Sequence, residues 1–313
     1  MIRLVLRRLA LSVPLVLVVS MLVFILEALT PGNAARSILG SGGTEAQYQA
    51  LRRQLGLNQP LVVQYWHYID NVFHGNFGSS LLTGQAVTTL LNQRLPVTLS
   101  LIILSTLLAA VAGILLGTVS AIRGGVIGKI VDALSMAGLA LPSFWLGLVL
   151  VVLFAEDLQW FPATGYTALD VSVTAWLRSL VLPVIALGMA GIAGIAKTTR
   201  ESMLDVLSRD FIRTLRAAGV PERSIIWKHA LRNAAIPVLS ITSLIFIGAL
   251  SGTVFVETVF VLPGLGSLVV TAVNNHEIAE IEGVAIYFTL IVVAVNLIVD
   301  IGYGWLNPKV RTS

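Results

Sequence analysis

Six apolar segments of about twenty residues each constrain the fold of this chain more than any other feature. They run over Leu9–Leu29, Val97–Ile122, Ile130–Ala155, Leu180–Ala196, Ala235–Val256 and Gly283–Ile301. At 1.5 Å per residue, about 20 helical residues cross the roughly 30 Å hydrocarbon core of a bilayer. Backbone groups in lipid must be satisfied within the segment, and the alternating pattern of barrel strands is absent. The sequence therefore predicts an all-α polytopic membrane protein with six transmembrane helices.

The composition supports this fold class and excludes several kinds of site. Hydrophobic residues make up 56% of the chain and charged residues only 12%, whereas a typical soluble domain is about one quarter charged. The chain has no cysteine, which excludes disulfides, thiolate metal sites and cysteine nucleophiles. Its four histidines are scattered over different loops without ligand-like spacing, so no metal site is expected.

The apolar segments divide the chain into three parts. Residues 1–29 are expected to form a short cytoplasmic end and the first transmembrane helix, and 30–96 an extracytoplasmic segment. Residues 97–313 would form a core of five transmembrane helices, with a long basic loop at 197–233. The aromatic residues of 30–96 suit either a membrane–water interface or a small folded lobe; the alternative is a partly ordered loop.

The distribution of positive charge sets the orientation. Arg3, Arg7 and Arg8 precede the first apolar segment, which is longer than the roughly 7–15-residue core of a secretory signal peptide. With a retained first helix and the N-terminus inside, 15 of the 20 Lys and Arg residues fall on the cytoplasmic side. This asymmetry follows the positive-inside rule. Both termini are therefore expected in the cytoplasm.

The basic loop, 197–233, has the pattern of two helices separated by a sharp break. Residues 200–218 are rich in helix formers and contain no proline. Gly219 is the residue type that ends a helix in left-handed geometry. Pro221 is suited to the first position of a second helix, and Glu222 to its first turn. The loop is therefore expected to be a compact projection. A simpler interpretation is a basic surface loop that contacts anionic lipid.

At this point the sequence resembles a known family. The stretch Arg213-Thr214-Leu215-Arg216-Ala217-Ala218-Gly219, followed by Ile236-Pro237, is similar to the loop signature of ABC importer permeases. Arg213, Thr214 and Leu215 depart from the general Glu-Ala-Ala pattern, but this form resembles dipeptide and oligopeptide permeases. Further similar motifs follow in order along the chain: Leu29-Thr30-Pro31-Gly32, Leu55-Gly56-Leu57-Asn58-Gln59-Pro60, Gly75-Asn76-Phe77-Gly78-Ser79-Ser80, His229-Ala230-Leu231-Arg232-Asn233, Glu257-Thr258-Val259-Phe260 and Pro263-Gly264-Leu265-Gly266.

The resemblance implies a function and a set of partners. The chain would be the first transmembrane subunit of a peptide importer in a prokaryotic plasma (inner) membrane. It would work by alternating access with a second homologous permease, two cytosolic ATPases and an extracytoplasmic substrate-binding protein, embedded in membrane lipid and without nucleic acid. The resemblance assigns docking on the ATPase to the residues of the helix and its break: Arg213, Thr214, Leu215, Arg216, Ala217, Ala218, Gly219, Val220, Pro221 and Glu222. A surface helix with no docking role is the alternative.

ATP chemistry is not expected on this chain itself. A phosphate-binding loop needs Gly, four residues, Gly-Lys and then Ser or Thr. The nearest match is Gly128-Lys129, where Arg123 stands in place of the first glycine and Ile130 in place of the hydroxyl residue. We therefore expect no enzymatic activity and no cofactor on the chain, and expect ATP and Mg²⁺ on the partner subunits.

Polar residues are sparse in the apolar segments, and two interpretations of them stay open. Candidates for a substrate path are Ser240, Ser243, Ser251, Thr253 and Asn296; the alternative is that these groups bond a neighbouring helix or their own backbone. Glu257 is a candidate outer gate or a contact for a delivery protein; alternatively it is simply solvated. Gly188, Gly191 and Gly194 lie near one helix face and predict close helix packing, or a surface that slides during transport.

Several other functions fit the same pattern. Permeases for nickel chelates, glutathione or other small solutes look similar to peptide permeases. A transporter driven by an ion gradient is a different class, disfavoured because the apolar segments lack deep carboxylates. A membrane sensor or scaffold, whose basic loop binds a signalling partner, is a third class. The loop signature favours the ABC permease.

Overall fold

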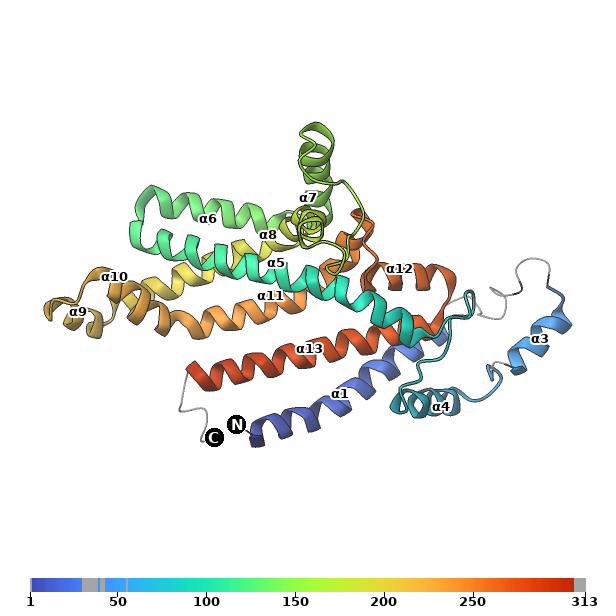
Figure 1. Ribbon diagram of the computed structural model, residues 1–313. Coiled ribbons are helices and arrows are strands. Elements are labelled where there is room, and N and C mark those ends of the chain that lie inside the picture. The colour runs from blue at the N-terminus through green and yellow to red at the C-terminus, as the bar shows by residue number, and fades with distance from the viewer. Residues whose placement is uncertain (1, 30–38, 40–42, 55, 307–313) are drawn as a thin grey trace. The chain divides into compact units, whose positions relative to one another are not determined.

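The computed structural model describes residues 2–29, 39, 43–54 and 56–306, and these are almost entirely helical (Figure 1). Parts of two predicted motifs, Thr30-Pro31-Gly32 and Leu55, lie outside the described residues, as do the basic residues Lys309 and Arg311. The elements are α1 (Ile2–Leu29), α3 (Glu45–Gln54), α4 (Leu61–Phe73), α5 (Val87–Arg123), α6 (Gly125–Ala140), α7 (Ser143–Leu150), η2 (Val151–Asp157), α8 (Val173–Ser208), α9 (Asp210–Ala217), α10 (Glu222–Ser224), η3 (Ile225–Ala230), α11 (Leu231–Val259), α12 (Leu265–Asn275) and α13 (Ile278–Leu306). The elements η2 and η3 are π-helical.

The predicted all-α polytopic fold is confirmed. Within the described residues, five helices are long and apolar enough to cross a membrane, and there are six candidate spans if the bent pair Gly128–Ala140 and Ser143–Asp157 counts as one broken span. The five single spans are Leu6–Leu26, Val87–Arg123, Val173–Ser208, Glu222–Val259 and Ile278–Trp305. Most run beyond the predicted apolar segments, because polar residues at the helix ends continue the helix outside the apolar stretch.

The third predicted span, Ile130–Ala155, is wrong as a single straight helix. The chain bends by 100° between Gly128–Ala140 and Ser143–Asp157. Proline disfavours helical geometry in the residue before it and has no N–H to donate. Leu141 accordingly adopts an extended conformation, with φ −83° and ψ 122°, and Pro142 caps the next helix. Pro142 was thus the visible signal for the break.

The described chain forms two compact units. One comprises Leu99–Leu262 together with the C-terminal part of α13 from Val295, and the other comprises Ile2–Thr98 and Pro263–Ala294. In the first unit, α8 packs against α6, α7 and α11, and Figure 1 shows α6, α8 and α11 alongside one another. Within α8's most apolar stretch, 67% of the residues are buried, which makes it the central helix of this unit.

Small residues let α5 approach α8 closely. A Cβ on Gly113 would stand 2.7 Å from Ile195 Cβ, and one on Gly117 would stand 2.7 Å from Thr199 Cβ. The two glycines are four residues apart, the spacing that brings helix backbones together in membranes. Side-chain atoms at either position would have to displace α8.

The predicted glycine face of α8 is a packing surface. A Cβ on Gly191 would lie 2.9 Å from Ala109 Cβ of α5 and 2.8 Å from Ile245 Cγ2 of α11. One on Gly188 would lie 3.1 Å from the Ser105 carbonyl oxygen of α5. The packing interpretation of these glycines is therefore confirmed, with α5 and α11 as the neighbouring helices.

In the second unit, a buried carboxylate links two distant parts of the sequence. Glu277, just before α13, is 2% exposed. Its carboxylate accepts hydrogen bonds from Ser80 Oγ at 2.7 Å and from the backbone N–H groups of Leu81 at 2.8 Å and Leu82 at 2.9 Å. Buried carboxylates need such donors to offset their lost hydration. The turn before α5 is thereby fixed to the start of α13.

The α5–α8 contact gives a first prediction. We expect Gly113→Leu to destabilise the protein by about 1–3 kcal/mol, since overpacking displaces neighbouring backbone. The matched control is Gly248→Leu on α11, where an added Cβ meets nothing within 4 Å. The measurement is the apparent melting temperature of each purified variant in detergent. Equal melting temperatures for the two variants would contradict close α5–α8 packing.

Candidate functional site

The basic loop contains one more helix break than the sequence predicted. The predicted helix over 200–218 is interrupted at Arg209, whose extended backbone (φ −72°, ψ 149°) separates α8 from α9. One local interaction favours this break: Ser208 Oγ donates to the Asp205 carbonyl at 2.8 Å. A side-chain bond of this kind competes with the helix backbone. Asp210 then begins α9 with a favourable negative charge in the first turn.

A single buried side chain anchors α9. Ile212 is fully buried, as is Ile225 at the start of η3, and α9 packs against both η3 and α8. The base of the loop is a cluster formed by Met203 and Val206 of α8, Ala230, Ala234 of α11 and Ala121 of α5. α9 is thus held against the ends of the membrane helices.

Gly219 ends α9 with a complete left-handed cap. Its φ is +75°, a conformation that costs other residues roughly 1–2 kcal/mol. The Gly219 N–H donates to the Arg216 carbonyl at 3.0 Å and the Val220 N–H to the Leu215 carbonyl at 3.1 Å. This pair of bonds is the Schellman motif, which satisfies the last carbonyls of a helix. The predicted sharp break is therefore present at the predicted residue.

Beyond the cap, an ion pair joins the two sides of the turn. Pro221 precedes α10 as its N-cap, one position earlier than expected, and Glu222 begins the helix. Arg216 Nε donates to Glu222 Oε1 at 2.6 Å. This hydrogen bond raises the pKa of the Arg216 guanidinium, so the guanidinium stays positively charged. Arg216, one of the residues that the resemblance assigns to docking, is thus paired within the loop.

The exposed face of α9 is small and carries one accessible cation. At about 100° per residue, Thr214 and Ala217 lie about 160° and 140° from the buried Ile212. Both are exposed, as are Ala218 and Gly219. The Arg213 side chain is 75% exposed, and its contact with the Asp210 carboxylate is long, at 3.3 Å. Pairs of this kind contribute little to stability. The face offers small residues for close approach and a guanidinium for an acidic partner.

An ion pair that sequence reasoning missed joins the start of this loop to α6. Arg200 Nη1 of α8 contacts Asp132 Oδ2 of α6 at 2.9 Å, with 24% and 41% of the side chains exposed. A Cβ on Gly128 would stand 3.1 Å from the same guanidinium. Asp132 is an ionisable residue inside an apolar segment, and such residues are usually paired. The position of Asp132 in an apolar segment was therefore the sequence signal that could have indicated an ion pair.

Of the candidate substrate-path residues on α11, Ser240, Ser243 and Ser251 lie within about 80° of one another around the helix, and Thr253 lies apart from them. Ser240, Ser243, Ser251 and Thr253 lie on α11, and Asn296 on α13. Thr253 lies about 160° around the helix from Ser251, is buried, and donates to the Leu250 carbonyl. Ser240 contacts both the Ile236 carbonyl at 3.0 Å and the Tyr303 hydroxyl at 2.6 Å. These contacts are the backbone and neighbouring-helix bonds of the alternative interpretation.

Glu257, the candidate outer gate, lies inside α11 and is fully buried. The helix continues to Val259, and the Glu257 carbonyl accepts from the Leu262 N–H at 2.8 Å. The interpretation in which the Glu257 carboxylate is solvated is therefore wrong. Burial of a carboxylate is costly, so this position depends on its protein surroundings.

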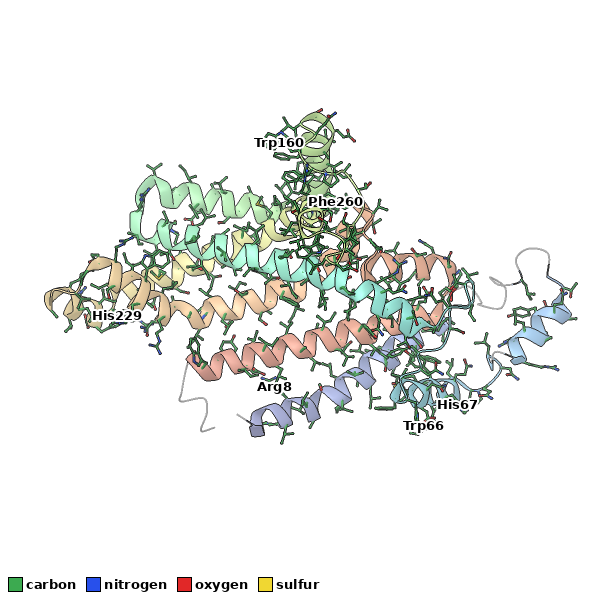
Figure 2. The ribbon with its side chains drawn as sticks, in the orientation of Figure 1. Arg8, Trp66, His67, Trp160, His229 and Phe260 are labelled. Carbon is green, nitrogen blue, oxygen red and sulfur yellow. The ribbon has the colours of Figure 1, made fainter. Side chains whose placement is uncertain are left out.

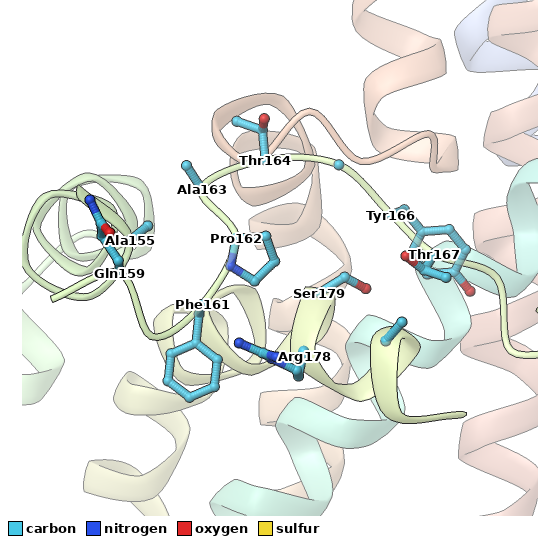
Figure 3. Close-up of a pocket in the computed structure, with 12 residues that line it drawn as sticks. Ala155, Gln159, Phe161, Pro162, Ala163, Thr164, Tyr166, Thr167, Arg178 and Ser179 are labelled. Carbon is cyan, nitrogen blue, oxygen red and sulfur yellow. The ribbon is translucent and has the colours of Figure 1, made fainter. Parts of the chain in front are cut away.

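A pocket of about 660 Å³ lies between η2, the connection 158–172 and the start of α8 (Figure 3). Small-molecule sites commonly have volumes of about 300–1,000 Å³. Arg178 is the charged residue of its lining, and its Nη2 donates to the Trp160 carbonyl at 2.9 Å. Tyr166, also in the lining, accepts from Trp176 Nε1 at 3.1 Å. The pocket combines aromatic surface with a cation, a chemistry suited to carboxylates.

The described residues contain no group of three or more His, Cys, Asp or Glu side chains placed to hold a metal ion. Nearly the whole chain matches two family models: residues 1–102 match the N-terminal model of the membrane components of binding-protein-dependent transport systems, and 109–312 match the binding-protein-dependent transport system inner membrane component. The chain belongs to this family of ABC importer permeases. The resemblance inferred from the loop signature is confirmed.

Curated relatives match the permease along its whole length. A putative peptide transport system permease protein of Brucella abortus (strain 2308) is 40% identical over 309 residues, covering 98% of each chain. A probable peptide ABC transporter permease protein of Sinorhizobium fredii is 38% identical over 308 residues, again covering 98% of each. A glutathione transport system permease protein of Salmonella typhimurium (strain LT2) is 38% identical over 312 residues, covering 99% of each.

A solved structure shares the fold. The MetNI methionine ABC transporter, in an inward-facing conformation, contains a chain that aligns with a TM-score of 0.55 and 16% sequence identity. The alignment covers 70% of the permease and 96% of that chain. The permease is a multi-pass membrane protein, and as part of an ABC transport system it works with an ATPase and further components.

The cap of α9 gives a second prediction. We expect Gly219→Ala to loosen the loop, because the left-handed geometry costs alanine roughly 1–2 kcal/mol. Space is not a factor, since an added Cβ meets nothing within 4 Å. Hydrogen exchange of the Gly219 and Val220 amides should quicken in the alanine variant and change much less in Gly219→Asn, because asparagine tolerates this geometry. Equal exchange in both variants would argue against the cap.

Proposed function

We propose that this permease carries dipeptides or oligopeptides into the cell by alternating access. The observation that carries the proposal is 40% identity to a putative peptide transport permease over 98% of both chains. Rigid-body rearrangement of packed helices can expose a cavity to one side of a membrane and then to the other. The tightly packed α5–α8–α11 group is the element of this chain suited to such motion.

The proposed assembly contains a second homologous permease, two cytosolic ATPases and an extracytoplasmic substrate-binding protein. ATP and Mg²⁺ bind to the ATPases, and the permease performs no chemistry itself. The setting is a prokaryotic inner membrane with both termini in the cytoplasm. Support for this orientation comes from the charge asymmetry, which puts 15 of 20 Lys and Arg residues on one side.

Coupling to the ATPase is assigned to the short helix α9 and its cap. Its exposed residues Arg213, Thr214 and Ala217 fit a groove on the partner, with the guanidinium directed at an acidic group. The buried Ile212 and the Arg216–Glu222 pair make the helix a rigid unit. Because α9 follows α8 after a single extended residue, displacement of α9 is transmitted to the central helix of its unit.

Glutathione import is the second candidate. The glutathione permease of Salmonella typhimurium is 38% identical over 99% of both chains, and glutathione is itself a small peptide. The two activities are separated by uptake in reconstituted vesicles. We expect unlabelled dipeptides or oligopeptides to compete with a labelled peptide, and glutathione not to compete. Competition by glutathione alone would replace the peptide assignment with the second candidate.

The coupling role gives a third prediction. Ala217→Trp places a large side chain at the centre of the exposed α9 face and should reduce solute-stimulated ATP hydrolysis by at least tenfold. The fold of the chain should be unchanged because Ala217 is exposed. The matched control is Glu201→Trp, at an exposed position of α8 outside the docking face. Full activity in Ala217→Trp, with normal amounts in the membrane, would contradict docking through α9.

A further inference from the structure

The helix α4 carries an exposed apolar stripe. Val62, Trp66 and Phe73 are 75%, 70% and 71% exposed, respectively. At about 100° per residue, all three lie within about 40° of one another around the helix. Single exposed apolar side chains are common on protein surfaces, but three large ones aligned on one helix face form a contiguous patch. Such patches usually mark a contact surface. Figure 2 labels Trp66 and its neighbour His67 on this helix.

The adjacent face of α4 is attached to the membrane helix α1. Ile69 is 6% exposed. The Tyr65 hydroxyl donates to the Leu17 carbonyl at 2.9 Å, and it lies 2.9 Å from Ser20 Oγ. The Tyr65 ring packs edge-on against Phe24, with the centroids 5.5 Å apart. The apolar stripe begins where this α1-facing surface ends, so the two form one continuous apolar arc.

The contacts place α4 beside the C-terminal half of the α1 span, as Figure 1 also shows. The span runs from Leu6 to Leu26, and only 6% of its residues are buried. The described parts of this chain therefore leave most of its circumference exposed, and its apolar composition suits contact with lipid. At 1.5 Å per residue, Phe24 lies about 3 Å below the end of the span and Leu17 about 14 Å below it. Tyr65 thus reaches into the bilayer while α4 lies near its boundary.

The remaining face of α4 is polar. His67, Asp70 and Asn71 are exposed and lie on the side of the helix away from α1. Asp70 is the only acidic residue of α4, and the helix contains no Lys or Arg. A helix with a broad apolar arc and a polar edge is suited to lying in the membrane interface. Without basic residues, its attraction to lipid is apolar and aromatic, not electrostatic.

We propose that α4 lies in the membrane interface beside the C-terminal end of α1, with Val62, Trp66 and Phe73 in contact with the acyl chains of phospholipid. The occupant of the stripe is lipid because the surface is continuous with the lipid-facing α1 helix and lies at the depth of the bilayer boundary. Tryptophan is enriched at that depth because its ring is apolar and its N–H is polar. In this arrangement, α4 and α1 share one apolar surface that faces lipid.

The natural absence of cysteine makes a direct test available. Single cysteines are introduced as Val62→Cys and Phe73→Cys on the stripe, and as His67→Cys and Asn71→Cys on the polar face as matched controls. Tyr65 and Ile69 stay intact, so the attachment to α1 is kept. Each variant carries a nitroxide label in the assembled transporter, reconstituted in phosphatidylcholine vesicles. Collision rates with oxygen and with a water-soluble nickel chelate are then measured by power saturation.

We expect labels at 62 and 73 to collide severalfold more with oxygen relative to nickel than labels at 67 and 71. Nickel accessibility at 62 and 73 equal to that at 67 and 71 would overturn the proposal, because the stripe would then face water. Immobile labels at 62 and 73, shielded from both reagents, would also overturn it. The occupant would then be a protein subunit.

Discussion

The close contact between α5 and α8 is the interaction on which the rest of this structure depends. Gly113 and Gly117 leave no room for side chains against Ile195 and Thr199, so the two backbones meet directly. In a bilayer, where apolar side chains gain little by leaving lipid, such close packing is a main source of helix association. It fixes α8 at the centre of its unit, and the C-terminal end of α8 forms the start of the basic loop.

The loop itself is rigid for reasons of local chemistry. Ile212 is the buried anchor of α9, the Gly219 cap satisfies the terminal carbonyls, and the Arg216–Glu222 pair closes the turn. A flexible tether would absorb the motion of a partner, whereas a capped helix held against α8 transmits it. The proposed coupling role therefore depends on backbone geometry as much as on the identity of the exposed side chains.

Much of the helical architecture could be predicted from the sequence, because the length of an apolar segment is a local signal. The helix break at Gly219 was predictable for the same reason. The 100° bend at Pro142 was missed because the apolar composition continues across it, although the proline was visible. Pairings between distant residues, such as Glu277 with Ser80 and Arg200 with Asp132, cannot be read from one sequence. Burial of Glu257 likewise depends on tertiary packing, so its place in the sequence gave no sign of it.

Docking of the ATPase on α9 is tested most directly by chemical cross-linking from α9 in native membranes. Ala217→Cys introduces one reactive site into a chain without cysteines, and a maleimide carrying a photoreactive group then captures its neighbours for mass spectrometry. We expect an adduct with a cytosolic ATPase subunit from this position and none from Glu201→Cys. Adducts with other proteins alone, or none at all from Ala217→Cys, would contradict α9 as the site where the ATPase docks.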